Sequence, residues 1–157
     1  MKTHLFNIGN ENSLKSGDKA DLNAWWKYNV EQNIITAGFD GEPDDRGDII
    51  FNRRINEFDL ILAYISGNGY VGVGLAGKND TYKLLTQSEV NDPAYPALHA
   101  HQRKITWLYY ILSIDNAIPA CDVGGVYPVP AERLVSPAEA EIIIRAFWQN
   151  INTVINC

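Results

Sequence analysis

The segment from Phe58 to Gly77 constrains the fold most, because two apolar runs flank a Gly-Asn-Gly corner. Runs of β-branched and aromatic residues on both sides of a short glycine turn are typical of a β-hairpin. We therefore expect residues 60–66 and 70–76 to pair as adjacent antiparallel strands. The repeated small residues of the second run leave room for another backbone, or a flat ligand, to come close.

The glycines of this corner also spell G-x-G-x-x-G, at Gly67, Gly69 and Gly72. That pattern indicates nucleotide binding when a helix begins just after the turn, so that the helix N-terminus faces a phosphate. Here the turn continues into Tyr-Val-Gly-Val-Gly, which is β-branched and has no helix cap. The chain also lacks the V-A-I-K, H-R-D and D-F-G motifs of a kinase glycine loop. The pattern therefore favours a hairpin over a phosphate loop.

The composition is that of a globular protein, with 46% apolar and 20% charged residues among 157. This length predicts a single domain over residues 1–157. The net charge of −6 argues against indiscriminate binding of a phosphate backbone, although it leaves room for a local basic patch. No run is long enough to cross a bilayer, and Cys121 and Cys157 do not indicate a disulfide framework. We therefore expect a cytoplasmic location.

The first forty residues predict a strand, a helix and a second strand. Residues 3–9 and 34–39 have strand composition. Between them, Leu22, Trp25, Trp26 and Val30 fall at offsets of three, four and eight, which places them on one helical face. Residues 49–51 are expected to extend briefly before the hairpin.

The second half predicts further strands and one terminal helix. We expect strands over residues 81–85 and 104–112, with a long excursion over 87–102 between them. The segment 125–130 is expected to be an edge or barrel-closing strand. Ser136 to Glu139 forms a capping box with proline at the first helical position. The helix over 138–150 is expected to bury Ala140, Ile143, Ile144, Phe147 and Trp148. Strands outnumber helices, so we expect an α+β domain with a curled, mainly antiparallel sheet or small barrel.

No cluster in the chain has the pattern of a catalytic or metal site. Asp44, Asp45 and Asp48 resemble a magnesium cluster, but the acidic-x-Lys pair of a restriction-type nuclease is missing, and a solvated turn is the better interpretation. His99 and His101 lack further zinc ligands at related spacing, which favours surface histidines in a loop. No serine or cysteine lies in a nucleophile motif. We therefore predict a protein that is not an enzyme and needs no metal or cofactor.

Three aromatic residues lie where a ligand could meet them. Phe39 ends a strand, and Tyr64 and Tyr70 flank the glycine corner. Most aromatic residues belong to cores, but rings that meet at strand ends beside polar groups can form a slot for a flat ligand such as a nucleobase.

The order of these motifs resembles the EVE and YTH branch of the PUA-like superfamily. The matching motifs are Leu5-Phe6-Asn7-Ile8-Gly9-Asn10-Glu11-Asn12, Ala24-Trp25-Trp26-Lys27-Tyr28, Ala37-Gly38-Phe39, the hairpin from Leu62 to Gly74, Ile105-Thr106-Trp107 and Ser136-Pro137-Ala138-Glu139-Ala140. The resemblance covers most of the chain, and the hairpin is its most specific part.

The resemblance implies a distorted β-barrel flanked by helices, which accepts a modified or flipped base of a nucleic acid in an aromatic pocket. It also implies a role for each matching residue: Phe39, Tyr64, Tyr70 and Trp107 wall the base, Asn10, Asn12 and Ser66 bond its edge, and Arg53 and Arg54 lie near phosphates. Such a protein is a non-catalytic reader, in some cases the specificity element of a bacterial defence system with a separate effector protein.

Two alternatives remain open from the sequence. The first is a small-molecule or protein-binding module on the same barrel, because a fold does not fix a function. The second is a hydrolase that uses the loop around Asp44.

Overall fold

The computed structural model describes residues 1–9, 19–95, 99–127 and 131–155, with side chains described for all of these except 19–21 and 152–155. The strands are β1 (Thr3–Gly9), β2 (Ile34–Ala37), β3 (Leu60–Ile65), β4 (Gly69–Ala76), β5 (Lys83–Leu84), β6 (His101–Tyr110) and β7 (Glu132–Leu134). The helices are α1 (Lys19–Glu31), α2 (Arg46–Ile49), α3 (Gln87–Val90) and α4 (Pro137–Ile155), with the short helical turns η2 (Ile50–Arg54), η3 (Asn79–Thr81), η4 (Ile114–Asn116) and η5 (Ala120–Val123).

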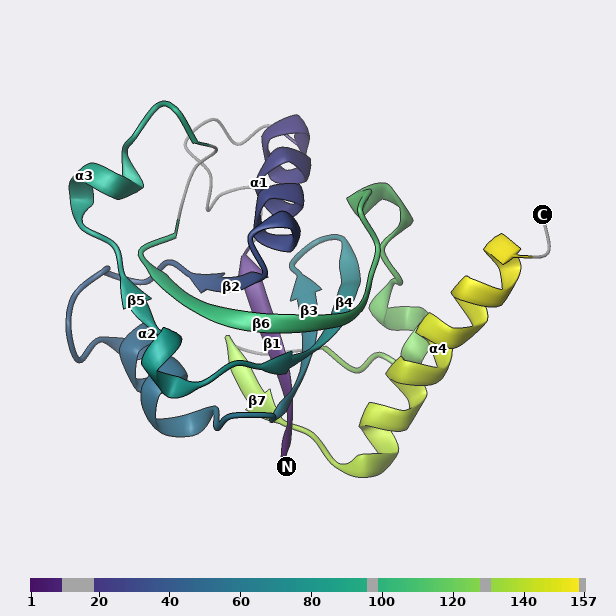
Figure 1. Ribbon diagram of the computed structural model, residues 1–157. Helices are drawn as coiled ribbons and strands as arrows, with labels where there is room; N and C mark the ends of the chain where they lie inside the picture. The colour runs from purple at the N-terminus through teal and green to yellow at the C-terminus, as the bar shows by residue number, and fades with distance from the viewer. Residues whose placement is uncertain (10–18, 96–98, 128–130, 156–157) are drawn as a thin grey trace.

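The strands form one curled sheet in the order β2-β6-β4-β3-β1-β7, and β5 also pairs with β6 (Figure 1). The β1–β3 pair is parallel, and the other pairs are antiparallel. Because β2 and β1 are far apart in this order, the curl is what brings their ends near each other. The fold is therefore α+β with a curled, mainly antiparallel sheet, as the sequence predicted.

The predicted hairpin is confirmed. Strands β3 and β4 pair with Tyr64 opposite Tyr70, and a bulge lies between Ala63 and Tyr64. The segment after the glycine corner is a strand, so the G-x-G-x-x-G pattern is not a phosphate loop.

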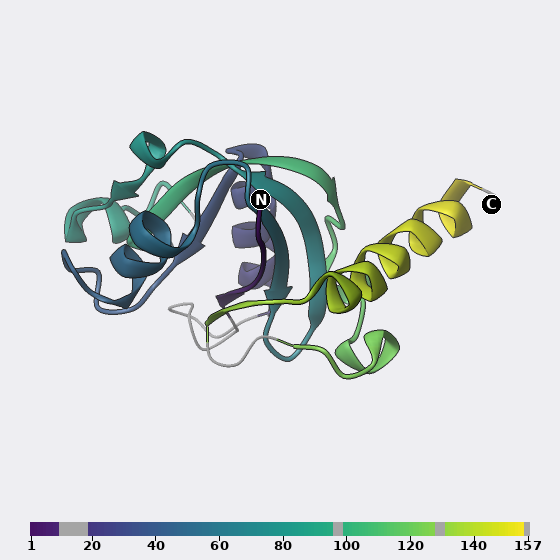
Figure 2. The same cartoon turned by 90° about the horizontal axis from the view of Figure 1, so that it is seen from below.

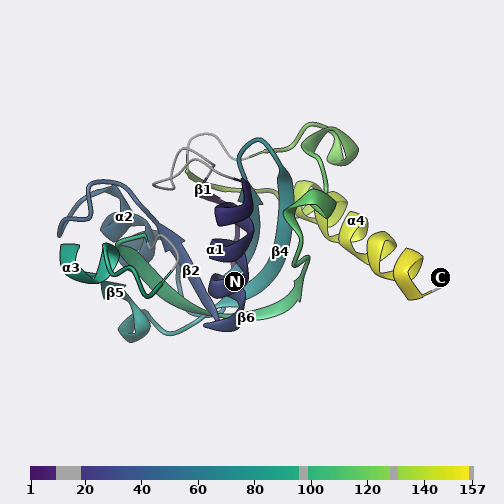
Figure 3. The same ribbon diagram turned by 90° about the horizontal axis from the view of Figure 1, so that it is seen from above.

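Each face of the sheet carries its own core. Helix α1 lies inside the curve made by β2, β6 and β4 and buries Leu22, Trp25 and Trp26 there (Figure 3). Helix α4 covers the other face with Ala140, Ile143 and Phe147, and its C-terminal end extends away from the sheet (Figure 2). The capping box of α4 is confirmed, since the Glu139 backbone N–H donates to Ser136 Oγ and the Ser136 N–H donates to the Glu139 carboxylate.

Ile144 and Trp148 were wrongly predicted to lie in this core. Their side chains are 39% and 64% exposed. The helical spacing that buries Ile143 and Phe147 turns these two residues toward the flank of α4.

Two further predictions about local structure were wrong. Residues 49–51 are helical, because the Asp45 side chain accepts hydrogen bonds from the N–H groups of Gly47 and Asp48 and so starts α2. The predicted edge strand over 125–130 was also wrong. The edge strand that pairs with β1 is β7, which follows that segment. Residues 125–127 form no strand, and residues 128–130 lie outside the described residues. A segment with two prolines lacks two of the donors that a ladder needs.

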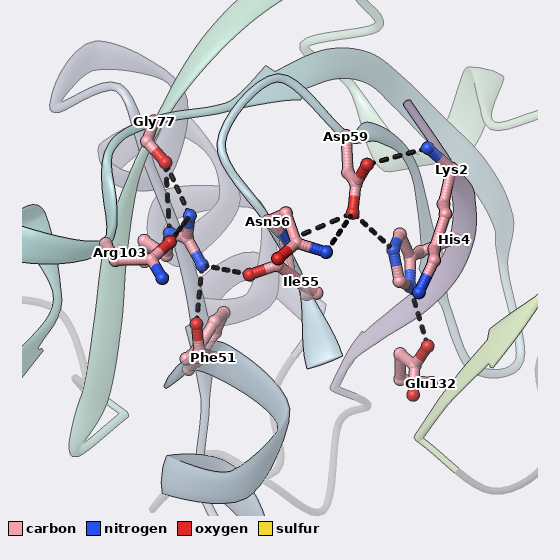
Figure 4. A network of polar contacts seen from close by, with 10 residues as sticks. Lys2, His4, Phe51, Ile55, Asn56, Asp59, Gly77, Arg103 and Glu132 are labelled. Atoms are coloured by element: carbon pink, nitrogen blue, oxygen red, sulfur yellow. Dashed lines mark hydrogen bonds and ion pairs between the residues drawn. The ribbon is translucent and has the colours of Figure 1, made fainter. Parts of the chain in front are cut away.

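Arg103 on β6 ties the helical segment 46–54 to the sheet from within. Its side chain is fully buried and donates to the carbonyl of Phe51 in that segment, to that of Ile55 directly after it, and to that of Gly77 after β4 (Figure 4). These bonds satisfy carbonyls where η2 and β4 end, so they fix where the segment lies against the sheet.

The two turn glycines give a test of the hairpin geometry. Gly69 has φ +144° and a Cβ there would lie 2.3 Å from the Ile118 carbonyl oxygen, whereas Gly67 has φ +81° and open space around it. We expect Gly67→Ala to lower the free energy of unfolding by about 1–2 kcal/mol through backbone strain alone. Gly69→Ala should cost about 1–3 kcal/mol more, because it adds a clash with backbone. Urea unfolding of both variants checks this, and equal losses would contradict the close approach of Ile118.

Candidate functional site

The structure brings Tyr64 and Tyr70 together, but in the second core. Their ring centroids are 5.0 Å apart with the rings nearly perpendicular. Tyr70 is fully buried, and its hydroxyl donates to the Val126 carbonyl oxygen at 2.5 Å. Burial raises the pKa of Tyr70 and Tyr64, which keeps both hydroxyls neutral. A buried ring cannot stack on a ligand, so Tyr70 does not wall the predicted slot, while Tyr64 is half-buried.

The other predicted wall residues separate in the same way. Trp107 packs edge-on against Trp26, with centroids 5.2 Å apart, in the core under α1. Tyr64 packs against the core under α4. These two residues therefore lie on opposite faces of the sheet.

Phe39 does line a cavity, at the point where β1 and β2 end. This cavity has a volume of about 350 Å³ and is lined by Asn7, Ile8, Gly9, Ala37, Gly38, Phe39 and His99. Its size falls within the range of small-molecule pockets. We call it the β1–β2 cavity.

The polar wall of the β1–β2 cavity is held rigidly. Asn7 donates from Nδ2 to Ser66 Oγ at 2.7 Å and accepts from the Gly9 N–H at 3.1 Å. Ser66, predicted to bond a ligand, positions Asn7 at this cavity. Asn10 and Asn12, predicted for the same role, lie outside the described residues.

Phe39 is held in an unusual backbone conformation beside this cavity. Its φ is +53°, and its side chain is 41% exposed. A non-glycine residue in the left-handed region costs about 1 kcal/mol or more, and such strain gathers at functional sites. The Arg46 guanidinium lies 5.7 Å above the ring centroid, within the range of a cation–π interaction.

His99 forms the inner wall of the cavity. It is buried, its Nδ1 lies 3.3 Å from Thr36 Oγ1, and its ring packs 5.0 Å from that of Trp25. Burial lowers the pKa of His99 to about 4, with the His101 charge acting in the same direction, so the ring is neutral at pH 7. Its Nε2 has no hydrogen-bond partner among the described residues.

Two more unpaired polar atoms lie beside His99. Trp25 Nε1 and Asn29 Oδ1 are buried and likewise have no partner within the described part of the chain. Asn29 is linked to His99 through Thr36, whose Oγ1 lies 3.4 Å from Asn29 Nδ2. An unpaired buried polar group costs about 1–3 kcal/mol, so such a cluster is unusual where nothing else binds to it.

The histidine pair and the aspartate loop have roles that the sequence did not predict. His101 is fully buried, with Nε2 2.8 Å from Asp45 Oδ2 and Nδ1 2.9 Å from the Tyr82 hydroxyl. Burial by itself raises the pKa of the Asp45 carboxyl. Hydrogen bonds from the Asp48 N–H and from His101 outweigh this effect, so the pKa lies below its ordinary value. The interpretations of surface histidines and of a solvated turn were therefore wrong for His99, His101 and Asp45. The contact between His101 and Asp45 holds the loop beside Phe39.

Arg53 and Arg54 do not lie at this cavity. They line a second one, of about 480 Å³, together with Lys2, His4, Glu132, Arg133 and Leu134. Among the described residues, no group of three or more His, Cys, Asp or Glu side chains is placed to hold a metal ion. Nor does any described helix combine the length and apolar character needed to cross a bilayer.

Sequence reasoning missed Asn7 and His99 as members of the site. Asn7 lies inside a strand, where a polar residue between Phe6 and Ile8 could have marked a functional position. His99 carried no signal of its own, because its burial depends on α1 and on Thr36 of β2.

No protein-family model matches the sequence, and no curated protein matches it. The fold does match solved structures. One of them is the YTH domain of the Zygosaccharomyces rouxii MRB1 protein, in complex with N6-methyladenosine RNA. The TM-score is 0.53 at 12% sequence identity, and the match covers 92% of this chain and 86% of that chain. The chain therefore has a YTH-like fold, as the order of its motifs predicted.

The lowered pKa of His99 predicts how stability depends on pH. The unfolded chain binds a proton at His99 near pH 6.5, whereas the folded chain does so only near pH 4. The His99 contribution to stability is therefore present above pH 6.5 and is lost as the pH falls toward 4. We expect the free energy of unfolding of the native chain to fall relative to His99→Gln by up to about 1.4 kcal/mol per pH unit in this window. Urea unfolding at pH 7.5, 6.5, 5.5 and 4.5 checks this, and parallel profiles would contradict a buried neutral His99.

Proposed function

We propose that the chain is a non-catalytic nucleic-acid reader that accepts a modified or extruded base in the β1–β2 cavity. The observation that carries this proposal is the cavity itself, which the partly exposed ring of Phe39 lines together with His99, whose buried Nε2 has no partner among the described residues. An aromatic face beside polar groups is the combination that recognises a flat heterocycle.

Each part of the cavity has a role in this proposal. Phe39 stacks on the base, which is worth about 1–3 kcal/mol for a base on an aromatic side chain. That energy offsets much of the few kcal/mol needed to extrude a base from a stack. Asn7, fixed by Ser66, and the neutral ring of His99 bond the polar edge of the base. Their rigid positions reduce the entropy lost on binding.

The structural neighbour supports a methylated base as the first ligand to test. That protein was solved with N6-methyladenosine RNA. At 12% identity the likeness concerns the fold alone, so the ligand of this chain rests on its own cavity. The motif resemblance supports two further parts of the proposal. A separate effector protein uses this reader, and the reader and its effector serve bacterial defence in the cytoplasm.

A second candidate is favoured by the charge beside Phe39. The segment that follows this residue carries the exposed side chains of Asp40 and Glu42, and Arg46 is the cation that faces the ring. An acidic rim repels phosphates and suits a free nucleoside or another small molecule. Calorimetric titration with N6-methyladenosine nucleoside, and with RNA that contains it, separates the two candidates: tighter binding of the RNA supports the reader.

Replacing Phe39 tests the site against a matched aromatic residue. We expect Phe39→Ala to weaken binding of N6-methyladenosine RNA by roughly 5- to 150-fold, the equivalent of one stacking interaction. Its melting temperature should change little, because the ring is 41% exposed. Tyr64→Ala is the control, and it should lower the melting temperature while leaving the Kd of the folded protein unchanged. Fluorescence anisotropy and thermal unfolding measure both. The reverse pattern, or no preference for the methylated RNA in the native chain, would contradict the proposal.

The proposal also predicts that the purified chain does not cleave DNA or RNA in Mg²⁺ or Mn²⁺. Asp45, the most buried acid of the Asp44 loop, is committed to capping α2 and to His101. Gel assays with single- and double-stranded substrates check this expectation. Metal-dependent cleavage would establish the hydrolase instead if Asp45→Ala, or Asp44→Ala at an exposed site, abolished it. The circular dichroism spectrum of that variant must be unchanged, so that the loss is not due to unfolding.

A further inference from the structure

Positively charged side chains gather around a cavity at the other end of β1. The 480 Å³ cavity there is lined by the cations Lys2, Arg53, Arg54 and Arg133, with His4, Glu132 and Leu134. We call it the basic groove. The whole chain has 13 lysines and arginines against 19 acidic residues, so four cations around one cavity run against its overall charge.

The acids beneath the basic groove are bound in a buried network. The His4 ring lies between two carboxylates, with Nδ1 2.7 Å from Glu132 Oε1 and Nε2 3.1 Å from Asp59 Oδ2 (Figure 4). Burial raises the pKa of Asp59, but hydrogen bonds from the N–H groups of Lys2 and Asn56 and from His4 lower it to about 2. The network joins β1, β7 and the residue directly before β3, so it fixes the floor of the groove.

The cations, by contrast, reach solvent. The side chains of Arg53 and Arg54 are 60% and 55% exposed, while that of Glu132 is 3% exposed. Arg53 pairs with Asp44, and because both groups are exposed this contact exchanges at little cost. Arg54 pairs with the buried Glu132 at 3.3 Å, and Arg133 pairs with Glu139 at 3.1 Å. No ion-pair partner of the Lys2 ammonium group is found among the described residues. The groove therefore presents to an anion the ammonium group of Lys2 and arginines that are in ion pairs but partly exposed to solvent.

The basic groove and the β1–β2 cavity are built on the same two elements. Strand β1 supplies Asn7 and Gly9 to the cavity and lies next to Lys2 at the groove, so the two sites are about 10–23 Å apart at 3.3 Å per residue. The helical segment 46–54 places Arg46 over Phe39 at its start and two groove arginines at its end. Phosphates recur about every 3.4 Å along a nucleic-acid helix, so three to seven nucleotides span the separation.

We propose that the basic groove binds phosphates of the nucleic acid several nucleotides away from the base in the β1–β2 cavity. This inference rests on the proposed function and adds a division of labour to it. The β1–β2 cavity selects the base. The acidic segment after Phe39 does not attract phosphates, so the remote basic groove supplies the electrostatic part of the affinity.

The salt dependence of binding tests the groove directly. The probes are a 20-nucleotide single-stranded RNA with one central N6-methyladenosine, the same RNA unmodified, and a 5-nucleotide RNA with the same central base. Anisotropy gives Kd at 50, 100 and 200 mM NaCl for the native chain and for the double variant Lys2→Gln, Arg53→Gln. Arg145→Gln is the matched control, because Arg145 is an exposed arginine in an ion pair with Glu141 on α4, away from the groove.

We expect the slope of log K against log salt concentration to become shallower by about 1–1.5 in the double variant, because each lost phosphate contact changes the slope by about 0.7. The change should be equal for the modified and the unmodified 20-nucleotide RNA. The control and the 5-mer should show no change. An unchanged slope with preserved preference for the methylated RNA would overturn the groove and leave the reader intact. A changed slope without such a preference would overturn the reader and leave the groove as a phosphate site. NMR shifts at Lys2 and Arg54 on titration with inorganic phosphate, together with an unchanged slope, would identify free phosphate as its ligand and overturn the nucleic-acid role.

Discussion

The buried guanidinium of Arg103 is the interaction on which both sites depend. It is fully buried, and it donates to the carbonyls of Phe51, Ile55 and Gly77 and to Asn79 Oδ1 (Figure 4). Burial lowers the pKa of Arg103, and the charges of Asp59 and Glu57 raise it in part. A guanidinium offers five donors in a fixed fork, which suits several carbonyls better than the single ammonium group of lysine. Since these bonds fasten segment 46–54 to β4 and β6, they decide where Arg46 meets Phe39 and where the groove arginines lie.

Selectivity and affinity are separated along β1. At its C-terminal end, the β1–β2 cavity combines the partly exposed ring of Phe39 with His99, whose buried Nε2 has no partner in the described residues. At its N-terminal end, the basic groove combines exposed cations with acids that are already bound in the network around His4. The proposed reader function is compatible with a net charge of −6, because phosphate binding needs positive charge that is local rather than abundant.

Local patterns predicted the fold well, because hairpins, capping boxes and helical faces are encoded over a few residues. The hairpin 60–76, the capping box at Ser136 and the buried face of Leu22, Trp25 and Trp26 are confirmed. Predictions that depended on which face of the sheet a residue occupies were less successful. Tyr70 was expected at a ligand and lies in a core, and His99 was expected in solvent and lies in the cavity wall. Alternation along a strand shows that two residues share a face, but the helix that covers that face is set by long-range packing.

The central claim is that the β1–β2 cavity receives the base. An NMR titration of ¹⁵N-labelled protein, including the long-range ¹H–¹⁵N spectrum of the histidine rings, with a 9-nucleotide RNA that carries one N6-methyladenosine, tests it most directly. The account predicts that the largest shifts occur at Gly9, Gly38 and Phe39 and at the ring nitrogens of His99, with smaller shifts for the unmodified RNA. Largest shifts in the hairpin around Tyr64 or along α4, with the His99 ring unaffected, would contradict it.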